Sequence, residues 1–388
     1  MPPANLDLSL RNSTYDQTCQ ISHRKVSAKE SRPCSADFAY RFCARSCRTI
    51  RQPAFGNSKL RCNAFAADNT GSGAFVSDRR HTQATMGDVL GFEAGAADDL
   101  LDDRKRGDIH EVINYRKAMR EAADLLKKLP LCRRMIEALH STLLEGVRGH
   151  DKHRGNFRDI QNWIGTSEDI EEAKFVPIAP GDPLINGMSA WEKYVNGDEV
   201  DPLVQLAVIH AEFESLHPFI DGNGRIGRMI IPIFLFERKL LHAPMFYMSA
   251  YLEKHREEYY QRLRMVSAKN DWAGWCEFFL KAVEHQASSN ESNVRSILDL
   301  YEKSKDRVIE ITHSQHAIHA LDYIFSQPVF NSTNFRTGSS IPEATCRRIL
   351  KLFADDGLLK IIKEPAGRSP AIYAFAELLN ITEGRKIF

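Results

Sequence analysis

The sequence predicts a mainly α-helical fold. Apolar residues recur at the spacing of one helical face in three stretches, residues 112–126, 136–144 and 203–216. A fourth stretch, from Met229 to Phe236, is almost wholly apolar, which is typical of a buried helix. The chain has 388 residues, of which 43% are hydrophobic and 27% are charged, so it is long enough for two or three domains with a substantial core.

A short polar loop separates the third and fourth of these helices, with the sequence His217-Pro-Phe-Ile-Asp-Gly-Asn-Gly-Arg-Ile-Gly-Arg228. Gly222 and Gly224 lack a Cβ atom, so the backbone there can adopt unusual dihedral angles and approach a ligand closely. The following helix should begin near Gly224, and the N–H groups of its first turn would form a seat for phosphate. The loop therefore predicts a phosphate-binding site.

Four further side chains of the loop suit the same chemistry. Arg225 and Arg228 lie three residues apart on one helical face, and their forked donors match phosphate oxygens. Asp221 offers a hard oxygen ligand beside the phosphate seat, which suits Mg²⁺ that keeps most of its waters. Histidine titrates near neutral pH, so His217 could take a proton from an attacking hydroxyl. Together they predict nucleotide-dependent group transfer to a hydroxyl, whereas a solvent-facing turn would explain only the glycines.

The loop resembles the signature of the Fic family, His-x-Phe-x-Asp-Gly-Asn-Gly-Arg-x-x-Arg, and matches it at every fixed position. The resemblance implies a Fic (Fido) helical-bundle domain with a short β-hairpin flap, which transfers AMP from ATP to a protein hydroxyl and requires Mg²⁺. It implies a role for each matching residue: His217 as general base, Asp221 as magnesium ligand, Gly222, Asn223 and Gly224 as the phosphate cradle, Phe219 in the same ATP-binding loop, and Arg225 and Arg228 at the outer phosphates.

Aromatic residues after the loop offer a surface for adenine. Fic proteins place tyrosines after the motif against this base, which makes Tyr260 the first candidate, followed by Tyr251 and Tyr259. Aromatic residues at helical spacing usually belong to the core, and this alternative stays open for all three. His210 lies one helical face away from His217, and we interpret it as a packed or hydrogen-bonded core histidine.

The order of segments predicts five regions. Residues 1–80 are basic and rich in serine, and they are interpreted as a disordered leader, an organellar transit peptide or non-native sequence. Similarity to the Fic family begins at about Thr82, and Met86 is a candidate internal start. The last catalytic helix should end near Ala287, before a linker or exposed helix. The predicted regions after the leader are an N-terminal Fic-associated helical region at 81–128, the catalytic domain at 129–287, a linker at 288–312 and a winged-helix-like domain at 313–380.

Residues 150–182 show little helical period and should form an extended segment with a short hairpin. In Fic proteins the corresponding hairpin is a flap that docks the backbone of the target by strand addition, which would give Ile164 to Phe175 this role. Trp163 is expected in the core.

The C-terminal segment resembles a winged helix-turn-helix, because a helix at 318–325, a second helix at 341–353 and two strands follow in this order. Some Fic proteins carry such a module at this end. Arg347, Arg348 and Lys351 on the second helix could meet DNA phosphates. Acidic residues of the same segment favour protein interaction or packing instead, so DNA binding stays open.

Many Fic proteins are held inactive by a helix with the pattern Ser/Thr-x-x-x-Glu-Gly/Asn, whose glutamate displaces and would repel the γ-phosphate. In relatives with this layout the helix precedes the segment at Thr82, where Arg79 and Arg80 stand here. Residues 141–146 match the pattern with Glu145, but they lie where relatives have a core helix, so we expect a chance match. A chain without the inhibitory glutamate would be constitutively active.

We therefore expect a protein adenylyltransferase that uses Mg²⁺ and ATP to modify a Ser, Thr or Tyr hydroxyl of a target protein. Alternatives are a related Fic transfer, the removal of AMP, or a DNA-binding regulator with an inactive Fic domain. Only three of the eight cysteines follow residue 63, so the sequence does not indicate a disulfide framework. No apolar run approaches the length of a membrane span. We therefore expect a cytoplasmic protein without membrane contact. ATP and a protein substrate are the expected partners, and a homodimer is left open.

Overall fold

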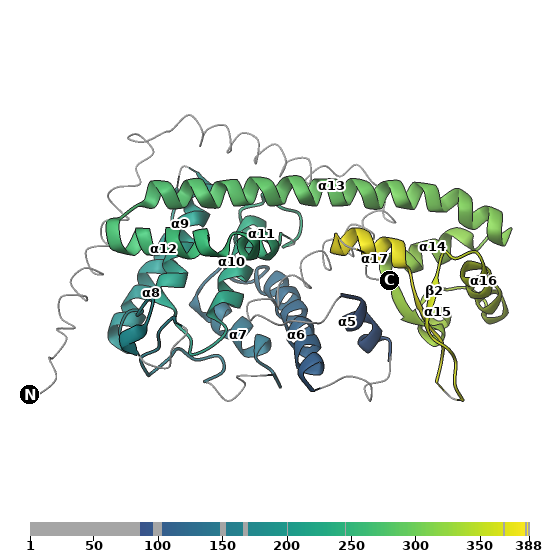
Figure 1. The fold of residues 1–388 in the computed structure, drawn as a ribbon, viewed down its shortest axis with the longest axis horizontal. Coiled ribbons are helices and arrows are strands. Elements are labelled where there is room, and N and C mark those ends of the chain that lie inside the picture. Colours follow the sequence, from purple (N-terminus) through teal and green to yellow (C-terminus); the bar gives the residue numbers. More distant parts are fainter. Residues whose placement is uncertain are drawn as a thin grey trace, which may run out of the picture. The chain divides into compact units, whose positions relative to one another are not determined.

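The structure is a computed structural model that describes residues 86–95, 103–147, 153–165, 170–199, 201–244, 246–367, 369–384 and 386. Helices dominate this part of the chain, which confirms the mainly α-helical prediction (Figure 1). It divides into two compact units, one of residues 117–244 and 251–285, the other of residues 86–116, 246–250 and 286–386. The predictions for residues 1–80, for the start at Thr82 and for Arg79 and Arg80 lie outside the described residues.

The first unit is built around helix α9, Pro202–Leu216. Asp201 caps its N-terminus by accepting hydrogen bonds from the N–H groups of Leu203 at 2.9 Å and Val204 at 3.3 Å. Residues on every side of α9 are buried, because it packs against α8, α10 and α12 (Figure 1). The bounds of the other helices of this unit are α7 (Arg133–Leu143), α8 (Asp182–Val195), α10 (Asn223–Glu237), α11 (Ser249–Lys254) and α12 (Arg256–Lys269).

An extended segment precedes α8, as the sequence predicts. Ile164 and Phe175 form an antiparallel bridge, in which the Ile164 N–H donates to the Phe175 carbonyl at 2.8 Å. A short 3₁₀ helix, Ile170–Glu172, lies between them. The expectation that Trp163 belongs to the core is wrong, because the residue is only half-buried in an irregular extended segment.

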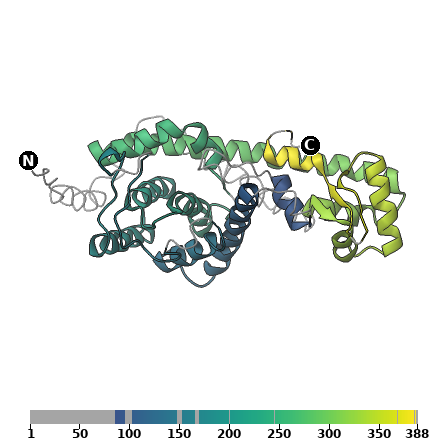
Figure 2. The same ribbon diagram turned by 60° about the horizontal axis from the view of Figure 1, so that its bottom comes forward.

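The second unit combines two parts of the chain that are far apart in sequence. Its elements are α5 (Met86–Glu93), α14 (Ala317–Ser326), β1 (Val329–Asn331), α15 (Ser332–Gly338), α16 (Glu343–Asp355), β2 (Lys360–Lys363), β3 (Ile372–Ala374) and α17 (Ala376–Glu383). The strands form an antiparallel sheet in the order β1-β3-β2, and α15 packs against both β1 and α16. Figure 2 shows these C-terminal elements gathered near one end of α13. The helix, second helix and two strands that the sequence predicts are present, and β1 and α15 are additional.

The core of the second unit includes residues from near the start of the described chain. Val89, Leu90 and Val112 are buried in one cluster with residues of α14, α16 and α17. The side chain of Asn331 donates a hydrogen bond to the Ala94 carbonyl at 2.9 Å and caps α15 by accepting from the Asn334 N–H at 2.7 Å. Residues 86–95 therefore belong structurally with the C-terminal elements.

Two long helices contribute residues to both units, α6 (Asp103–Leu125) and α13 (Trp272–Thr312). The prediction that the last catalytic helix ends near Ala287 is wrong, because α13 continues without a break through the expected linker (Figure 1). Ion pairs such as Arg295–Glu291 at 2.7 Å support the polar part of this helix. Among the helices described, none combines the length and the apolar character that crossing a membrane requires.

Candidate active site

The polar loop connects α9 to α10, and both of its ends have left-handed backbone. His217 forms the C-terminal cap of α9 with φ 45° and ψ 59°, and its N–H donates to the Phe213 carbonyl at 3.0 Å. Gly222 precedes α10 with φ 81°, a conformation that favours glycine. Gly224 lies inside α10, which begins one residue before the predicted start. His217 and the first turn of α10 therefore lie at the two ends of one short loop.

A buried arginine from the extended segment holds the start of this loop. Arg158 is 2% exposed, and its Nε donates to the His217 carbonyl at 3.0 Å. Its guanidinium also donates to the carbonyl groups of Leu216, at 3.5 Å, and Ile178. Burial lowers the pKa of Arg158 to about 10, so the side chain is still protonated at neutral pH. A cation at the C-terminal end of α9 complements the helix dipole and fixes the backbone of His217.

A buried histidine from α7 holds the other end of the loop. The His140 Nδ1 atom accepts a hydrogen bond from the Gly155 N–H at 2.9 Å, so its Nε2–H donates to the Asp221 carbonyl at 2.9 Å. Burial lowers the pKa of His140 to about 4, which agrees with this neutral form. A Cβ atom on Gly222 would lie 3.3 Å from His140 Nε2, so the glycine also permits a close approach of the ring.

Hydrogen bonds between residues of the loop itself hold its middle part. The Asn223 amide accepts from the Phe219 N–H at 2.8 Å and donates to the Phe219 carbonyl at 2.7 Å. The Phe219 ring is fully buried and stacks on His140 with 3.8 Å between the ring centroids. The expected contact of Phe219 with ATP therefore cannot come from its ring, and both residues contribute by fixing the shape of the loop.

The charged residues of the motif lie at the start of α10. Arg225 and Arg228 are half-buried in its first turns, and Asp221 is half-buried just before it. Asp221 Oδ1 accepts a hydrogen bond from the Gly222 N–H at 2.8 Å, which orients the carboxylate at the helix N-terminus. No cluster of three metal-ligating side chains occurs in the described part of the chain. One carboxylate beside a phosphate seat still fits Mg²⁺, which is commonly bound by one or two carboxylates, waters and phosphate oxygens.

His210 confirms the prediction of a core histidine. It is fully buried, and its Nδ1–H donates to the Gly227 carbonyl at 3.1 Å, so its Nε2 accepts from the Tyr259 hydroxyl at 3.0 Å. Burial lowers the pKa of His210 to about 4. The chain Tyr259–His210–Gly227 ties α12 and α9 to the turn of α10 that carries the two arginines. Tyr259 is 8% exposed and has its hydroxyl in this chain, so it is a core residue.

A cavity of about 460 Å³ lies beside the loop. Ile164 and Phe175 of the bridged segment form part of its wall, and Tyr260 and Leu263 of α12 form another part. The size and the mixture of apolar and polar groups suit a small organic ligand. Of the three tyrosines considered for adenine, Tyr260 lines this cavity, whereas Tyr251 stacks on His255 at 4.3 Å between ring centroids.

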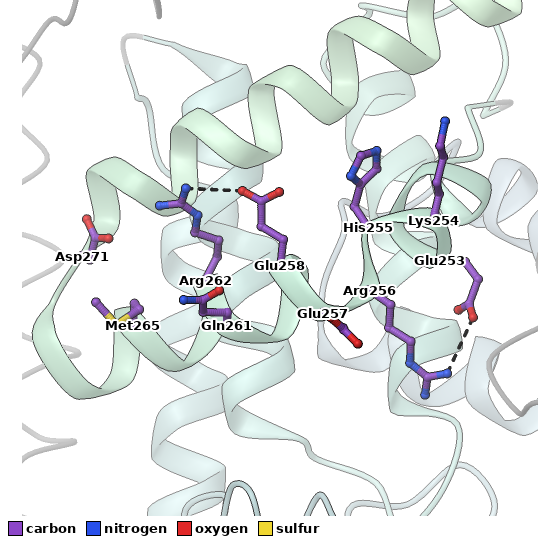
Figure 3. Close-up of a pocket in the computed structure, with 10 residues that line it drawn as sticks. All are labelled: Glu253, Lys254, His255, Arg256, Glu257, Glu258, Gln261, Arg262, Met265 and Asp271. Carbon is purple, nitrogen blue, oxygen red and sulfur yellow. Dashed lines mark hydrogen bonds and ion pairs between the residues drawn. The ribbon is translucent and has the colours of Figure 1, made fainter.

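A second cavity, of about 740 Å³, lies along α11 and α12 and includes Asp271, the residue before α13 (Figure 3). Its wall is made mostly of charged side chains, several of which pair with one another. Arg262 reaches Glu258 at 3.3 Å, and Arg256 reaches Glu253 at 3.6 Å (Figure 3). The smaller cavity is the candidate ligand site, because Glu214 and Ser215, which come just before His217 at the end of α9, line it and do not line the larger one.

Two further sequence predictions concern residues away from the loop. Glu145 forms an ion pair with Lys117 on the surface, which agrees with a chance match to the inhibitory pattern. In α16, Arg347 pairs with Glu343 at 2.6 Å and Arg348 donates to the Thr312 carbonyl at 3.2 Å. Lys351 is exposed. Contact of these residues with DNA stays a prediction.

Sequence reasoning missed His140, Arg158 and Glu214, which together surround the loop. His140 had a detectable signal, because it lies on the apolar face of α7 next to Leu139 and Leu143. Arg158 had none, because the carbonyl groups that it binds come from distant parts of the chain. Glu214 had a weak signal, because it is a charged residue on a mostly apolar helix.

The fold and the loop define a mainly helical protein with a glycine-containing polar loop at the start of a buried helix. Residues 130–235 match the model of the Fic/DOC family, so this part of the chain is a Fic/DOC family domain. Protein adenylyltransferase Fic of Drosophila grimshawi is 27% identical over 171 residues, which are 43% of this chain and 32% of that protein. A probable protein adenylyltransferase of Aquifex aeolicus is 29% identical over 157 residues, which are 39% of this chain and 44% of that protein.

The chain thus spans less than half of the length of either relative. Among solved structures, a Fic domain containing signaling protein from Bacteroides thetaiotaomicron aligns with a TM-score of 0.52 at 16% identity. The alignment covers 66% of this chain and 97% of that one, which shows a common fold.

Proposed function

We propose that the protein is a protein adenylyltransferase, which transfers AMP from ATP to a Ser, Thr or Tyr hydroxyl of another protein. The observation that carries the proposal is the loop between α9 and α10, where buried groups hold a histidine and an arginine-bearing helix start together. The names of the two relatives support the reaction type.

In this reaction the target hydroxyl attacks the α-phosphorus of ATP. A bond forms between the hydroxyl oxygen and phosphorus, the bond to the β-phosphate breaks, and pyrophosphate leaves. His217 takes the hydroxyl proton, a role that contributes about 10²–10⁴-fold to rates. N–H groups at the start of α10, with Arg225 and Arg228, hold the phosphates and stabilise the leaving group. Mg²⁺ beside Asp221 would neutralise phosphate charge.

The cavity beside the loop would hold the nucleoside part of ATP. Tyr260 and Leu263 offer apolar surface to the base, and Ile164 lines the same cavity. Residues 164–175 would then dock the target backbone by strand addition, because Ile164 and Phe175 are already bridged. DNA binding by residues 313–380 and a homodimer stay open, and a cytoplasmic location stays a prediction.

The test compares transfer from α-labelled and γ-labelled ATP in the presence of Mg²⁺ and a cell lysate. We expect protein-bound label only from the α position, and its loss in His217→Ala with ATP binding retained. His319→Ala, which changes an exposed histidine of α14, is the matched control. Transfer from the γ position would indicate a kinase, and loss of ATP binding in His217→Ala would contradict the role of general base. Competition between nucleotides separates AMP transfer from the related transfers.

A further inference from the structure

The wall of the smaller cavity contains one buried carboxylate, that of Glu214. Glu214 lies in the last turn of α9 and is 9% exposed. The neighbouring Ser215 lines the same cavity. The transfer reaction described above uses neither residue. A carboxylate in a nucleotide site repels phosphate, so it is expected to meet the parts of a nucleotide that donate hydrogen bonds.

Helix α10 leaves space for this carboxylate. A Cβ atom built on Gly227 would lie 2.2 Å from Glu214 Oε1, so any side chain at residue 227 would displace the glutamate. Gly227 lies inside a helix, where glycine costs about 0.5–1 kcal/mol relative to alanine. The close approach of Glu214, rather than a turn, is what requires glycine at this position.

The position of Glu214 indicates which part of the nucleotide it would meet. It contacts Gly227, which lies between Arg225 and Arg228, where the phosphates are expected. Glu214 also lines the same cavity as Tyr260, where the base is expected. The sugar of a nucleotide lies between its base and its phosphates, and its hydroxyl groups are hydrogen-bond donors.

We propose that Glu214 accepts hydrogen bonds from the ribose hydroxyls of the bound nucleotide and makes the site selective for ribonucleotides. The proposal rests on the proposed function, because it takes the cavity as the ATP site. A hydrogen bond to a charged acceptor has an effect of about tenfold or more on binding when the donor is removed. The 2′- and 3′-hydroxyls are the two donors that the experiment separates.

The experiment measures the dissociation constants of ATP, 2′-deoxy-ATP and 3′-deoxy-ATP for the full chain with Mg²⁺. We expect the wild type to bind ATP about tenfold more tightly than at least one deoxy analogue. In Glu214→Val the preference should disappear, because ATP binding falls to the level of that analogue. Glu214→Gln keeps the size of the side chain and should reduce the preference, which decides the question if the valine variant does not fold.

The matched control is Glu212→Gln, on the same helix but not in the wall of the cavity. It should keep the wild-type preference. An unchanged preference in both Glu214 variants, with ATP still bound, would overturn the role of Glu214 and leave the proposed function intact. A changed preference between ATP and inosine triphosphate would assign Glu214 to the base amino group and overturn the ribose contact. Absence of ATP binding in the wild type would overturn both.

Discussion

Two buried histidines hold the loop from different helices, and both are neutral. Their hydrogen bonds leave one ring nitrogen of each as a donor to a backbone carbonyl and the other as an acceptor. A protonated imidazole has only donors, so protonation would break one bond of each histidine. The loop that carries His217 is therefore expected to be sensitive to acid.

We expect the free energy of unfolding to fall as the pH falls from about 6.5 to about 4. His210 has its pKa lowered from 6.5 to about 4 by burial, so in this window the unfolded chain binds a proton that the folded chain does not. The contribution of His210 to the free energy of unfolding is therefore fully present above pH 6.5 and is lost as the pH falls towards 4. Urea unfolding across this range measures the effect.

The variant His210→Gln tests the assignment to this residue. Glutamine can still donate to the Gly227 carbonyl and accept from the Tyr259 hydroxyl, but it does not titrate. Its pH dependence should be shallower than that of the wild type, while His319→Gln on the surface serves as control. Equal slopes for wild type and His210→Gln would show that His210 does not contribute.

At the residue scale, sequence patterns predicted the members of the motif but not their supports. His217, Asp221 and the arginines are recognisable because their types and spacing match one chemistry. Arg158 acts on carbonyl groups of residues 178, 216 and 217, which only the folded chain brings together. Tyr260 and Tyr259 are adjacent in sequence, and only the packing of α12 shows that one lines the cavity and the other is in the core.

At the scale of the elements, one side chain donates hydrogen bonds to several carbonyl groups at the C-terminal end of α9. Helix ends leave four carbonyl groups without helical partners, and burial makes such groups costly. Arg158 donates to two of them, on Leu216 and His217, and at the same time to the extended segment. The helix end and the segment that leads to Ile164 are therefore stabilised together.

We expect Arg158→Met to lower the free energy of unfolding by about 3 kcal/mol, because it leaves buried carbonyl groups without donors. It should also reduce transfer, since the backbone of His217 loses its support. Arg154→Met, which changes an exposed arginine of the same segment, should change stability by less than about 0.5 kcal/mol. Chemical denaturation measures both, and equal stabilities of the two variants would contradict the role of Arg158.

Among the elements, α9 and α10 were predictable and the full length of α13 was not. Apolar periodicity marks α9, and a continuous apolar run marks α10. Residues 288–305 are polar, so their pattern does not distinguish a linker from an exposed helix. In the structure they are helical, and pairs such as Glu291–Arg295 and Glu302–Lys305 lie at the spacing that supports a helix.

At the scale of the whole molecule, residues 86–116 share a core with residues 286–386. Sequence patterns could not show this, because pairing between distant helices leaves no local period. We expect Leu90→Ala, in α5, to lower the stability of this unit by about 2–4 kcal/mol, because Leu90 is 3% exposed in that core. Hydrogen exchange of α14 and α16 should then become faster.

Ile309→Ala, at a 48% exposed position of α13, is the control for the same unit and should leave exchange of α14 and α16 unchanged. Unchanged exchange in Leu90→Ala would mean that α5 does not belong to this core.

The hydrogen bond from Asn331 to Ala94 joins residues that are 237 positions apart. A ribosome adds about 5–20 residues per second, so Ala94 is made roughly 10–50 s before its partner exists. During this interval the apolar face of α5, with Val89 and Leu90, has no core to enter, whereas residues 117–244 and 251–285, which form the other unit, are synthesised before the C-terminal elements. The segment that is made first in the described chain is thus among the last to be buried, and it is the part of the nascent protein that a chaperone would be expected to cover.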